Sequence, residues 1–228
     1  WNGRTHLFFQ SNPTSAAWGP PEWAHMVSDD LMHWTQLPAA LTPAMPPADD
    51  AGCWTGSIVP VNGEPWLYYS AARNVPSAPR LQAIGLARPL DEDLVTWQKH
   101  PGNPLFGPPA SPEVTRGDFR DPWVWPVEGG YRMLVGASLE NRGAALVYAS
   151  EDGVSWRYLH PLMDAADAYA IDPDAIMWEV PVLRSLGAYD LLVLGSMHEH
   201  ERTRTLVIVG HYRNDRFEPV ATYRMDHA

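Results

Sequence analysis

The sequence has few cysteines, few basic residues and no long apolar run, and each shortage excludes a class of protein. Cys53 is the only cysteine among the 228 residues, so no disulfide can form within the chain. Lysine and arginine total 16 against 27 aspartates and glutamates, and the formal charge of −11 disfavours binding to nucleic acid. No run of about 18 apolar residues is present, so we expect no membrane-spanning helix and no membrane partner.

Proline and tryptophan are abundant instead, with 23 and 11 copies. Proline at this density opposes long helices and favours short strands joined by turns. Tryptophan favours strands and also lines sugar-binding clefts. Because 45% of the residues are hydrophobic, the chain can build a sizeable core. These observations predict an all-β fold.

A turn motif that ends in an aromatic residue recurs along the chain. Its copies are SDDLMHW at 28–34, DEDLVTW at 91–97, SEDGVSW at 150–156 and a weaker RNDRF at 213–217. The aromatic residues are separated by 63, 59 and 61 residues, and they are Trp34, Trp97, Trp156 and Phe217. We expect them to pack within repeated structural units.

A second motif recurs with the same period. A turn leads into an apolar run that ends in a small residue, and these end residues are Ser11, Ala71, Ala137 and Ser196. Each unit then holds about four short strands, and repeated four-stranded units predict a β-propeller of about four blades around a central channel. The alternative is a β-sandwich in which the motifs recur by accident.

One strand precedes each of the later apolar runs, and we expect it to be the inner strand of its blade. These strands are CWTGSIV at 53–59, FRDPWVW at 119–125 and MWEVPVL at 177–183. Thr55, Asp121 and Glu179 fall at one position of the repeat, with spacings of 66 and 58 residues. Residues at one position of successive inner strands are expected to converge at the mouth of the channel.

Two carboxylates at one position of the repeat, near tryptophans, indicate glycoside chemistry. One carboxylic acid protonates the leaving oxygen while another carboxylate attacks the anomeric carbon or activates water. Glu179 lies between Trp178 and Val180 in the sequence, an apolar setting that we expect to hold its proton near neutral pH. The alternative is that Asp121 only caps a turn and pairs with Arg120.

Several motifs resemble those of glycoside hydrolase family 32, the β-fructofuranosidases that include invertases, levanases and inulinases. HLFFQSNPTSAAWG is similar to the family's HLFYQ-NP…WG, and WAHMVSDDLMHWTQLPAALTP is similar to its WGHAVS-DL-HW-LP-AL-P segment. CWTGSIV, FRDP and MWEVP resemble the family's FSGSA, RDP and WECP motifs, with Val180 in place of the usual cysteine. RFEPVATYRMDHA resembles a motif near the end of the family's fourth blade, so the resemblance covers nearly the whole chain.

The resemblance implies a five-bladed propeller that cleaves β-fructosides with retention of configuration, without a metal or other cofactor. By position, Glu179 would be the acid/base, Asp121 would stabilise the transition state through the fructosyl hydroxyls, and Arg120 would assist it. A second group would bind sugar in the −1 subsite or at its rim: Gln10, Trp18, Trp54 and Thr55. The implied partner is a small-molecule or polymeric fructoside, and the sequence does not choose among sucrose, sucrose phosphate, inulin and levan.

The family's nucleophile is an aspartate in an NDPNG motif on the inner strand of the first blade, and no such motif occurs here. The repeat period places that strand just upstream of Trp1. We therefore expect residues 1–228 to be one propeller catalytic domain that is incomplete at both ends, without the covalent intermediate that needs this aspartate. The compartment, cytoplasmic or secreted, and the oligomeric state are left open.

Three other features have plain interpretations. Cys53 is expected to pack as a small apolar residue rather than to act as a catalytic thiol. The segment MHEHERTR at 197–204 is expected to be a solvated loop rather than a metal site, and PADDAG at 47–52 a polar turn rather than a cation site.

Two other functions stay open at this point. One is a non-catalytic carbohydrate-binding propeller, which would keep Trp18 and Trp54 but would not need Glu179. The other is a five-bladed propeller hydrolase that acts on arabinose or xylose polymers.

Overall fold

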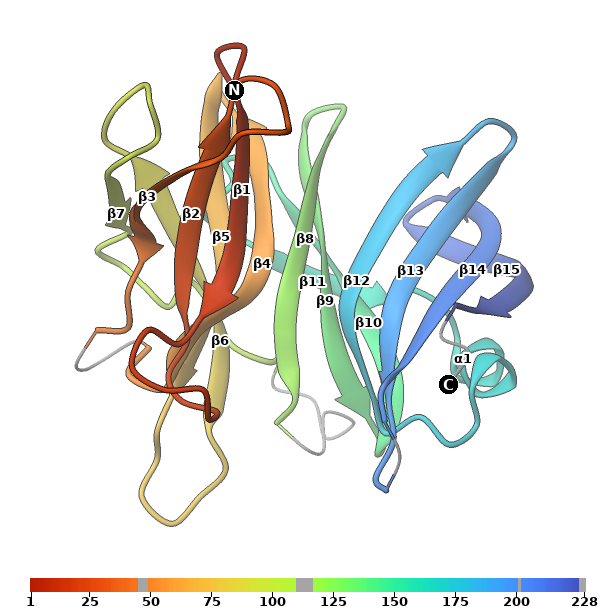
Figure 1. Ribbon diagram of the computed structural model, residues 1–228. Coiled ribbons are helices and arrows are strands. Elements are labelled where there is room, and N and C mark those ends of the chain that lie inside the picture. The colour runs from red at the N-terminus through yellow and green to blue at the C-terminus, as the bar shows by residue number, and fades with distance from the viewer. Residues whose placement is uncertain (45–48, 110–116, 201, 226–228) are drawn as a thin grey trace. The chain divides into compact units, whose positions relative to one another are not determined.

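The computed structural model describes residues 1–44, 49–109, 117–200 and 202–225 (Figure 1). The described residues form fifteen strands and one short helix, which confirms the predicted all-β class. The chain divides into two compact units, Trp1–Phe106 and Gly107–Ala228. No helix in the described part of the chain is long and apolar enough to cross a membrane.

The first unit contains two antiparallel sheets in which each strand pairs with its neighbour in sequence. The strands of the first sheet are β1 (Thr5–Ser11), β2 (Glu22–Ser28) and β3 (Thr35–Leu41). The strands of the second sheet are β4 (Gly52–Val61), β5 (Glu64–Arg73), β6 (Leu81–Pro89) and β7 (Trp97–Lys99). A shared core that includes Trp23, Leu41, Leu67 and Ala87 joins the two sheets.

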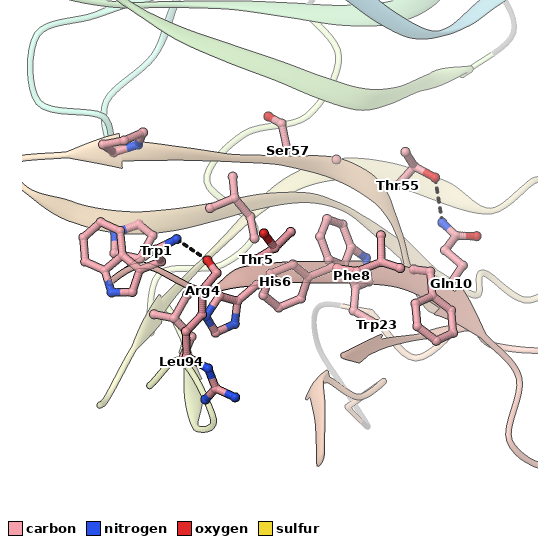
Figure 2. A pocket seen from close by; sticks show the side chains of 16 residues that line it. Trp1, Arg4, Thr5, His6, Phe8, Gln10, Trp23, Thr55, Ser57 and Leu94 are labelled. Carbon is pink, nitrogen blue, oxygen red and sulfur yellow. Dashed lines mark hydrogen bonds between the residues drawn. The ribbon is translucent and has the colours of Figure 1, made fainter. Parts of the chain in front are cut away.

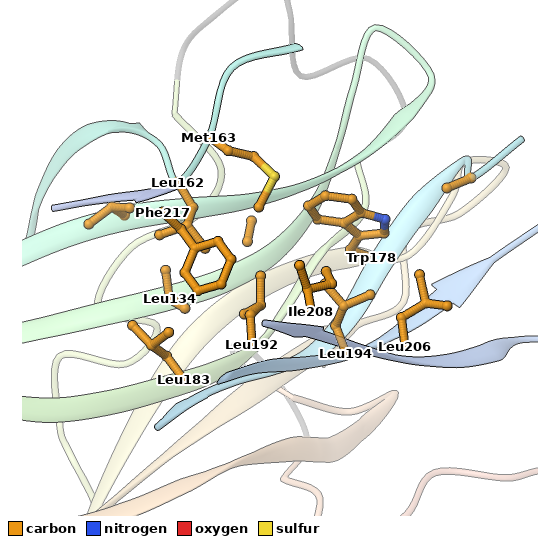
Figure 3. Packing of buried hydrophobic residues seen from close by; sticks show 13 residues of the cluster. Leu134, Leu162, Met163, Trp178, Leu183, Leu192, Leu194, Leu206, Ile208 and Phe217 are labelled. Carbon is orange, nitrogen blue, oxygen red and sulfur yellow. The ribbon is translucent and has the colours of Figure 1, made fainter. Parts of the chain in front are cut away.

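The second unit contains two four-stranded sheets of the same up-and-down order. The strands of its first sheet are β8 (Phe119–Val127), β9 (Gly130–Leu139), β10 (Arg142–Ser150) and β11 (Arg157–Pro161). The elements that follow are α1 (Ala165–Ile171), β12 (Met177–Leu186), β13 (Tyr189–Met197), β14 (Arg204–Arg213) and β15 (Arg216–Arg224). Figure 3 shows the core between these sheets, in which Trp178, Leu134, Leu192 and Phe217 are buried.

The repeated tryptophan closes the same turn in three of the sheets. Its indole N–H donates to the carbonyl three residues earlier, in the pairs Trp34–Leu31 at 3.2 Å, Trp97–Leu94 at 2.8 Å and Trp156–Gly153 at 3.1 Å. The carbonyl residue has a left-handed backbone in each pair, with φ of 64°, 57° and 75°. An aspartate accepts two backbone N–H bonds of each turn, and these residues are Asp30, Asp91 and Asp152. The sequence repeat therefore marks a structural repeat, and Phe217 differs in being fully buried in the core.

Residues 49–52 form a turn, as expected for the segment 47–52, of which 47 and 48 lie outside the described residues, but Asp49 is not exposed in it. Its side chain is fully buried and accepts hydrogen bonds from Lys99 Nζ at 2.6 Å and Tyr69 Oη at 2.7 Å. The ammonium group of Lys99 is thus the positive partner of this buried carboxylate. Cys53 packs as a small buried residue, as predicted, and burial raises the pKa of its thiol to about 12.

A pair of histidines lies between β1 and β2. His6 Nδ1 and His25 Nε2 are 2.9 Å apart, and the His25 ring stacks on Phe8 at a centroid distance of 4.1 Å. His25 has no exposed surface, and burial lowers its pKa to about 4, with the neighbouring His6 as a second cause. A neutral pair shares one N–H between the two rings, whereas protonation of both would place two positive charges in contact.

We predict that Lys99→Met destabilises the protein by about 3 kcal/mol, because Asp49 is left buried without its positive partner. The control is Arg4→Met, which removes the exposed Arg4–Asp29 pair at 2.8 Å and should cost less than about 1 kcal/mol. Urea unfolding measures both values. Equal losses would show that the burial of Asp49 does not matter.

We predict that stability falls as the pH is lowered from 6.5 to 4. The folded pKa of His25 lies below its ordinary value of 6.5, so the unfolded chain binds more protons in this window. The loss is on the order of 2 kcal/mol. His25→Phe should remove this part of the pH dependence, and His211→Phe, at a half-exposed histidine on β14, should retain it. Identical pH profiles of unfolding for the wild type and His25→Phe would contradict the prediction.

Candidate active site

Arg120 holds three carboxylates together in the second unit. Its Nη2 donates to Glu179 Oε2 at 3.1 Å, and its Nη1 donates to Asp118 Oδ1 at 3.1 Å. Its Nε lies 3.8 Å from Asp121 Oδ2. The guanidinium group is nearly buried, with 11% of the side chain exposed, whereas the Glu179 side chain is 26% exposed. The structure therefore brings together Arg120, Asp121 and Glu179, as predicted, at a partly open surface.

Matching irregularities in β8 and β12 place these side chains. Both are the first strands of their sheets and they pack against each other. The register of pairing with the next strand shifts directly after Arg120 in β8 and directly after Glu179 in β12. The next residue has a left-handed backbone, with φ of 64° at Asp121 and 48° at Val180. Val180 N–H donates to Asp121 Oδ2 at 2.9 Å, so the two irregularities are joined directly.

The strand pairing corrects the predicted alignment of the repeat by one residue. Each residue just before a register shift pairs with the residue sixteen positions later on the neighbouring strand. These pairs are Trp54–Ser70, Arg120–Gly136 and Glu179–Gly195. The residues that follow them share one position, and these are Thr55, Asp121 and Val180. Glu179 therefore corresponds to Arg120, not to Asp121. The same position of the repeat thus holds an arginine on β8 and a glutamate on β12.

Glycine provides the space for Glu179 on the strands beside it. A Cβ on Gly195 would lie 2.8 Å from Glu179 Cγ and 3.2 Å from its Oε1. A Cβ on Gly136 would lie 2.3 Å from the carbonyl oxygen of Trp178. Real Cβ atoms avoid the closer of these distances, so both positions require glycine for the observed packing.

Two members of this cluster were missed by sequence reasoning. Asp118 pairs with Arg120 across two positions of the same segment, a signal that was present in GDFRD. Met197 accepts a hydrogen bond from Arg120 Nη2 at 2.8 Å through its sulfur. No sequence pattern marks Met197, because only the pairing of β12 with β13 brings it to this place.

The setting of Glu179 differs from the expected apolar one. Trp178 is turned to the other side of the strand and buried in the core, and Val180 is 42% exposed. The nearest polar partner of the carboxylate is the guanidinium of Arg120. Adjacent strand residues point to opposite faces, so proximity in sequence did not mean proximity of side chains.

The predicted sugar-binding residues form contacts with one another in the first unit. Gln10 Nε2 donates to Thr55 Oγ1 at 2.8 Å, and the rings of Trp18 and Trp54 meet edge to face at 6.0 Å. Trp18 is 69% exposed and can receive a ligand on its free face. Figure 2 shows Gln10 and Thr55 at one end of a groove of about 640 Å³ that runs along β1 and β4.

His198 is the exception in the expected solvated loop at residues 197–204, in which Glu199, His200, Arg202 and Thr203 are exposed and residue 201 lies outside the described part. Its Nε2 is 2.9 Å from Asp172 Oδ2, and both side chains are 4% exposed. Ser196 Oγ donates to the same oxygen at 2.9 Å, and Arg204 Nη1 donates to Oδ1 at 3.2 Å. This network ties the end of α1 to β13 and β14. Among the described residues, no group of three or more His, Cys, Asp or Glu side chains could hold a metal ion.

The chain was compared with known families and with curated relatives. The model of the family described as "Glycosyl hydrolases family 32 N-terminal domain" matches residues 1–228. A cell wall β-fructofuranosidase of Pisum sativum is 36% identical over 188 residues, which cover 79% of this chain and 32% of that protein. An acid β-fructofuranosidase of Phaseolus vulgaris is 38% identical over 187 residues, which cover 78% of this chain and 26% of that protein.

Solved structures show the same fold. A family 32 β-fructofuranosidase of Bombyx mori matches with a TM-score of 0.84 and 26% identity, over 99% of this chain and 48% of that chain. Fructan 1-exohydrolase IIa of Cichorium intybus matches with a TM-score of 0.78 and 31% identity, over 96% and 42%. The chain thus spans about a third or less of the length of these curated relatives and less than half of these solved chains. Together with the four sheets, these matches confirm the predicted β-propeller.

We predict that Gly195→Ala displaces Glu179 from Arg120 and destabilises the protein by about 1–3 kcal/mol, because the new methyl group overlaps the glutamate side chain. The control is Gly107→Ala, since a Cβ there meets no atom within 4 Å. Urea unfolding gives the stabilities, and a change in the carboxyl carbon resonance of Glu179 reports its displacement. An unchanged resonance in Gly195→Ala would refute the role of this glycine.

Proposed function

The chain belongs to glycoside hydrolase family 32, and we propose that it carries the acid/base and the stabilising carboxylate of a β-fructofuranosidase. The proposed reaction removes terminal β-D-fructofuranosyl residues from sucrose or fructans with retention of configuration. The observation that carries the proposal is the cluster in which Arg120 contacts both Glu179 and Asp121. The names of the relatives, β-fructofuranosidases and a fructan exohydrolase, support this substrate class.

Glu179 is proposed as the acid/base. Its side chain is 26% exposed, and within the described part of the chain its carboxylate accepts one hydrogen bond, from Arg120, so the carboxyl group is able to reach a ligand. In the first step it gives its proton to the oxygen that leaves the fructosyl carbon. In the second step the same carboxylate takes a proton from the water that attacks that carbon, as reversal of the first step requires.

Asp121 is proposed to hold hydroxyl groups of the fructosyl ring. Its carboxylate is 5% exposed and is fixed by the backbone N–H of Val180 at 2.9 Å. A carboxylate held in this way accepts hydrogen bonds that strengthen as positive charge develops on the ring. Arg120 links Asp121 and Glu179, because it contacts both.

The polar and aromatic residues of the first unit are proposed to bind sugar. Gln10 and Thr55 already form one hydrogen bond, so a ligand hydroxyl can join an ordered pair at little further ordering cost. Trp18 and Trp54 offer apolar ring surface to the C–H groups of a sugar. We propose residues 1–228 as part of a catalytic propeller, in line with the family match over their full length.

The nucleophile is not assigned to any of these residues. The Asn-Asp-Pro-Asn-Gly stretch that the family resemblance links to this role does not occur in residues 1–228. The test of the proposal therefore uses the full translation product of the gene that encodes these residues, and the 228-residue chain is assayed beside it.

We predict that Glu179→Gln in the gene product lowers kcat on sucrose by at least about a hundredfold, because proton transfer to the leaving oxygen is lost. With an aryl β-fructofuranoside, whose phenolate leaves without needing a proton, added azide should restore turnover and yield fructosyl azide, since an anion needs no general base to attack a covalent intermediate. Asp121→Asn should lose activity without rescue by azide. The matched control is Glu218→Gln, an exposed glutamate on β15, which should keep full activity.

The outcomes separate the proposed enzyme from the alternatives. A gene product that binds sucrose without hydrolysing it, and that binds equally well after Glu179→Gln, would indicate a sugar-binding propeller. Release of arabinose or xylose from polymers, without release of fructose, would indicate the other propeller hydrolases. Full activity of Glu179→Gln would overturn the acid/base assignment.

A further inference from the structure

A loop of residues 12–21 connects β1 to β2 and is tied to β4 close to both of its ends. Its residues lie outside the strands. Just before the loop, Gln10 Nε2 on β1 donates to Thr55 Oγ1 at 2.8 Å. At its end, the carbonyl oxygen of Pro21 accepts a hydrogen bond from the backbone N–H of Cys53 at 2.9 Å. The 12–21 loop therefore begins and ends beside the part of β4 that is proposed to bind sugar.

Asn12 closes this loop through both polar atoms of its side-chain amide. Its Nδ2 donates to the carbonyl oxygen of Ala17 at 2.8 Å. Its Oδ1 accepts hydrogen bonds from the backbone N–H of Thr14 at 3.2 Å and from the Thr14 hydroxyl at 2.9 Å. Ser15 Oγ accepts the N–H of Ala17 at 3.0 Å, so both polar backbone groups of Ala17 are bonded within the loop. The Ala17 carbonyl belongs to the peptide group that leads to Trp18, and these bonds thus fix the backbone that carries the indole ring.

Trp18 depends on this backbone for its position, because burial does little to hold it. The residue is 69% exposed, and its ring meets that of Trp54 edge to face at 6.0 Å. Trp18 and Gln10 also line one hollow of about 290 Å³, which the loop forms with the end of β1. An exposed side chain loses rotamer freedom when a ligand orders it, so a ring that is already in place binds at a lower entropic cost.

Gly19 leaves room for the Asn12 amide on the far side of the tryptophan. A Cβ at position 19 would lie 2.6 Å from Asn12 Nδ2 and 3.3 Å from its Cγ. Real Cβ atoms avoid the closer of these distances, so a side chain here would push the amide away from the Ala17 carbonyl. The residues on both sides of Trp18 are therefore fitted to the same asparagine.

We propose that Asn12 is a positioning residue for sugar binding, because it holds the 12–21 loop in the shape that places Trp18 beside Trp54. Its hydrogen bond to Ala17 orders the loop before the sugar arrives, and the Trp18 ring is then available to the C–H groups of a fructosyl unit. The part of this inference that concerns sugar rests on the proposed function. The placement of the ring by Asn12 does not depend on hydrolysis.

The first test measures the contact between Trp18 and Trp54 in the 228-residue chain. Two indole rings in contact give bands of opposite sign in far-ultraviolet circular dichroism, and Trp18→Phe defines the contribution of this pair. We expect Asn12→Ala and Asn12→Asp to lose most of that contribution, since neither side chain can donate to Ala17. The matched control is Asn74→Ala, which removes an exposed asparagine between β5 and β6 and should retain it.

Urea unfolding identifies which of these variants are folded. A full contribution of the tryptophan pair in folded Asn12→Ala or Asn12→Asp would overturn the proposal. Gly19→Ala provides a second route, because it keeps the asparagine and displaces only its amide. We expect Gly19→Ala to lose the contribution as well, and Gly107→Ala, where a Cβ meets no atom within 4 Å, to retain it.

The second test measures the kinetics of the full gene product on sucrose. A poorly placed ring weakens the binding of substrate and transition state alike, so KM should rise about fivefold in Asn12→Ala while kcat changes less than about twofold. A fall in kcat with unchanged KM would contradict a role in binding. A gene product that does not hydrolyse sucrose would overturn the proposed function, whereas circular dichroism would still decide whether Asn12 places Trp18.

Discussion

The candidate site depends on one guanidinium group that connects two sheets. Arg120 leaves β8 and reaches Glu179 on β12, while Asp118 and Asp121 on its own segment neutralise and orient it. Three carboxylates this close would repel one another without a central positive charge. A planar group with five N–H donors can serve several acceptors at once, which a lysine ammonium on a flexible chain does less well. The positions of both proposed catalytic carboxylates thus follow from how this one side chain is packed.

The sequence repeat predicted the strands well because its period reports local structure. The turn motif and the apolar runs mark features that each sheet forms from its own residues, and the first strands of three sheets lie where they were expected. The position of Glu179 within the repeat was wrong by one residue. The spacing of Thr55, Asp121 and Glu179 does not reveal the ladder shifts, which displace the register. A better signal was present in the sequence, since Pro122 and Pro181 each follow the left-handed residue.

Contacts between distant segments could not be predicted from the sequence. Asp49 and Lys99 are 50 residues apart, and both sit in segments that read as ordinary polar turns or strand ends. Asp172 and His198 are 26 residues apart and were not linked by any motif. In each case a buried charge is tolerated only because a partner arrives from another strand, and such partners depend on the tertiary fold.

The backbone at Val180 has a consequence for how this site balances stability against geometry. A β-branched residue is a rare occupant of the left-handed region, and such a conformation costs about 1–3 kcal/mol. The surrounding contacts, above all the hydrogen bond to Asp121, hold Val180 in this state. Glu179 is therefore positioned next to a strained backbone conformation. A residue that adopts the left-handed conformation more easily would relieve that strain and make the folded chain more stable. The glutamate beside it would then sample more positions.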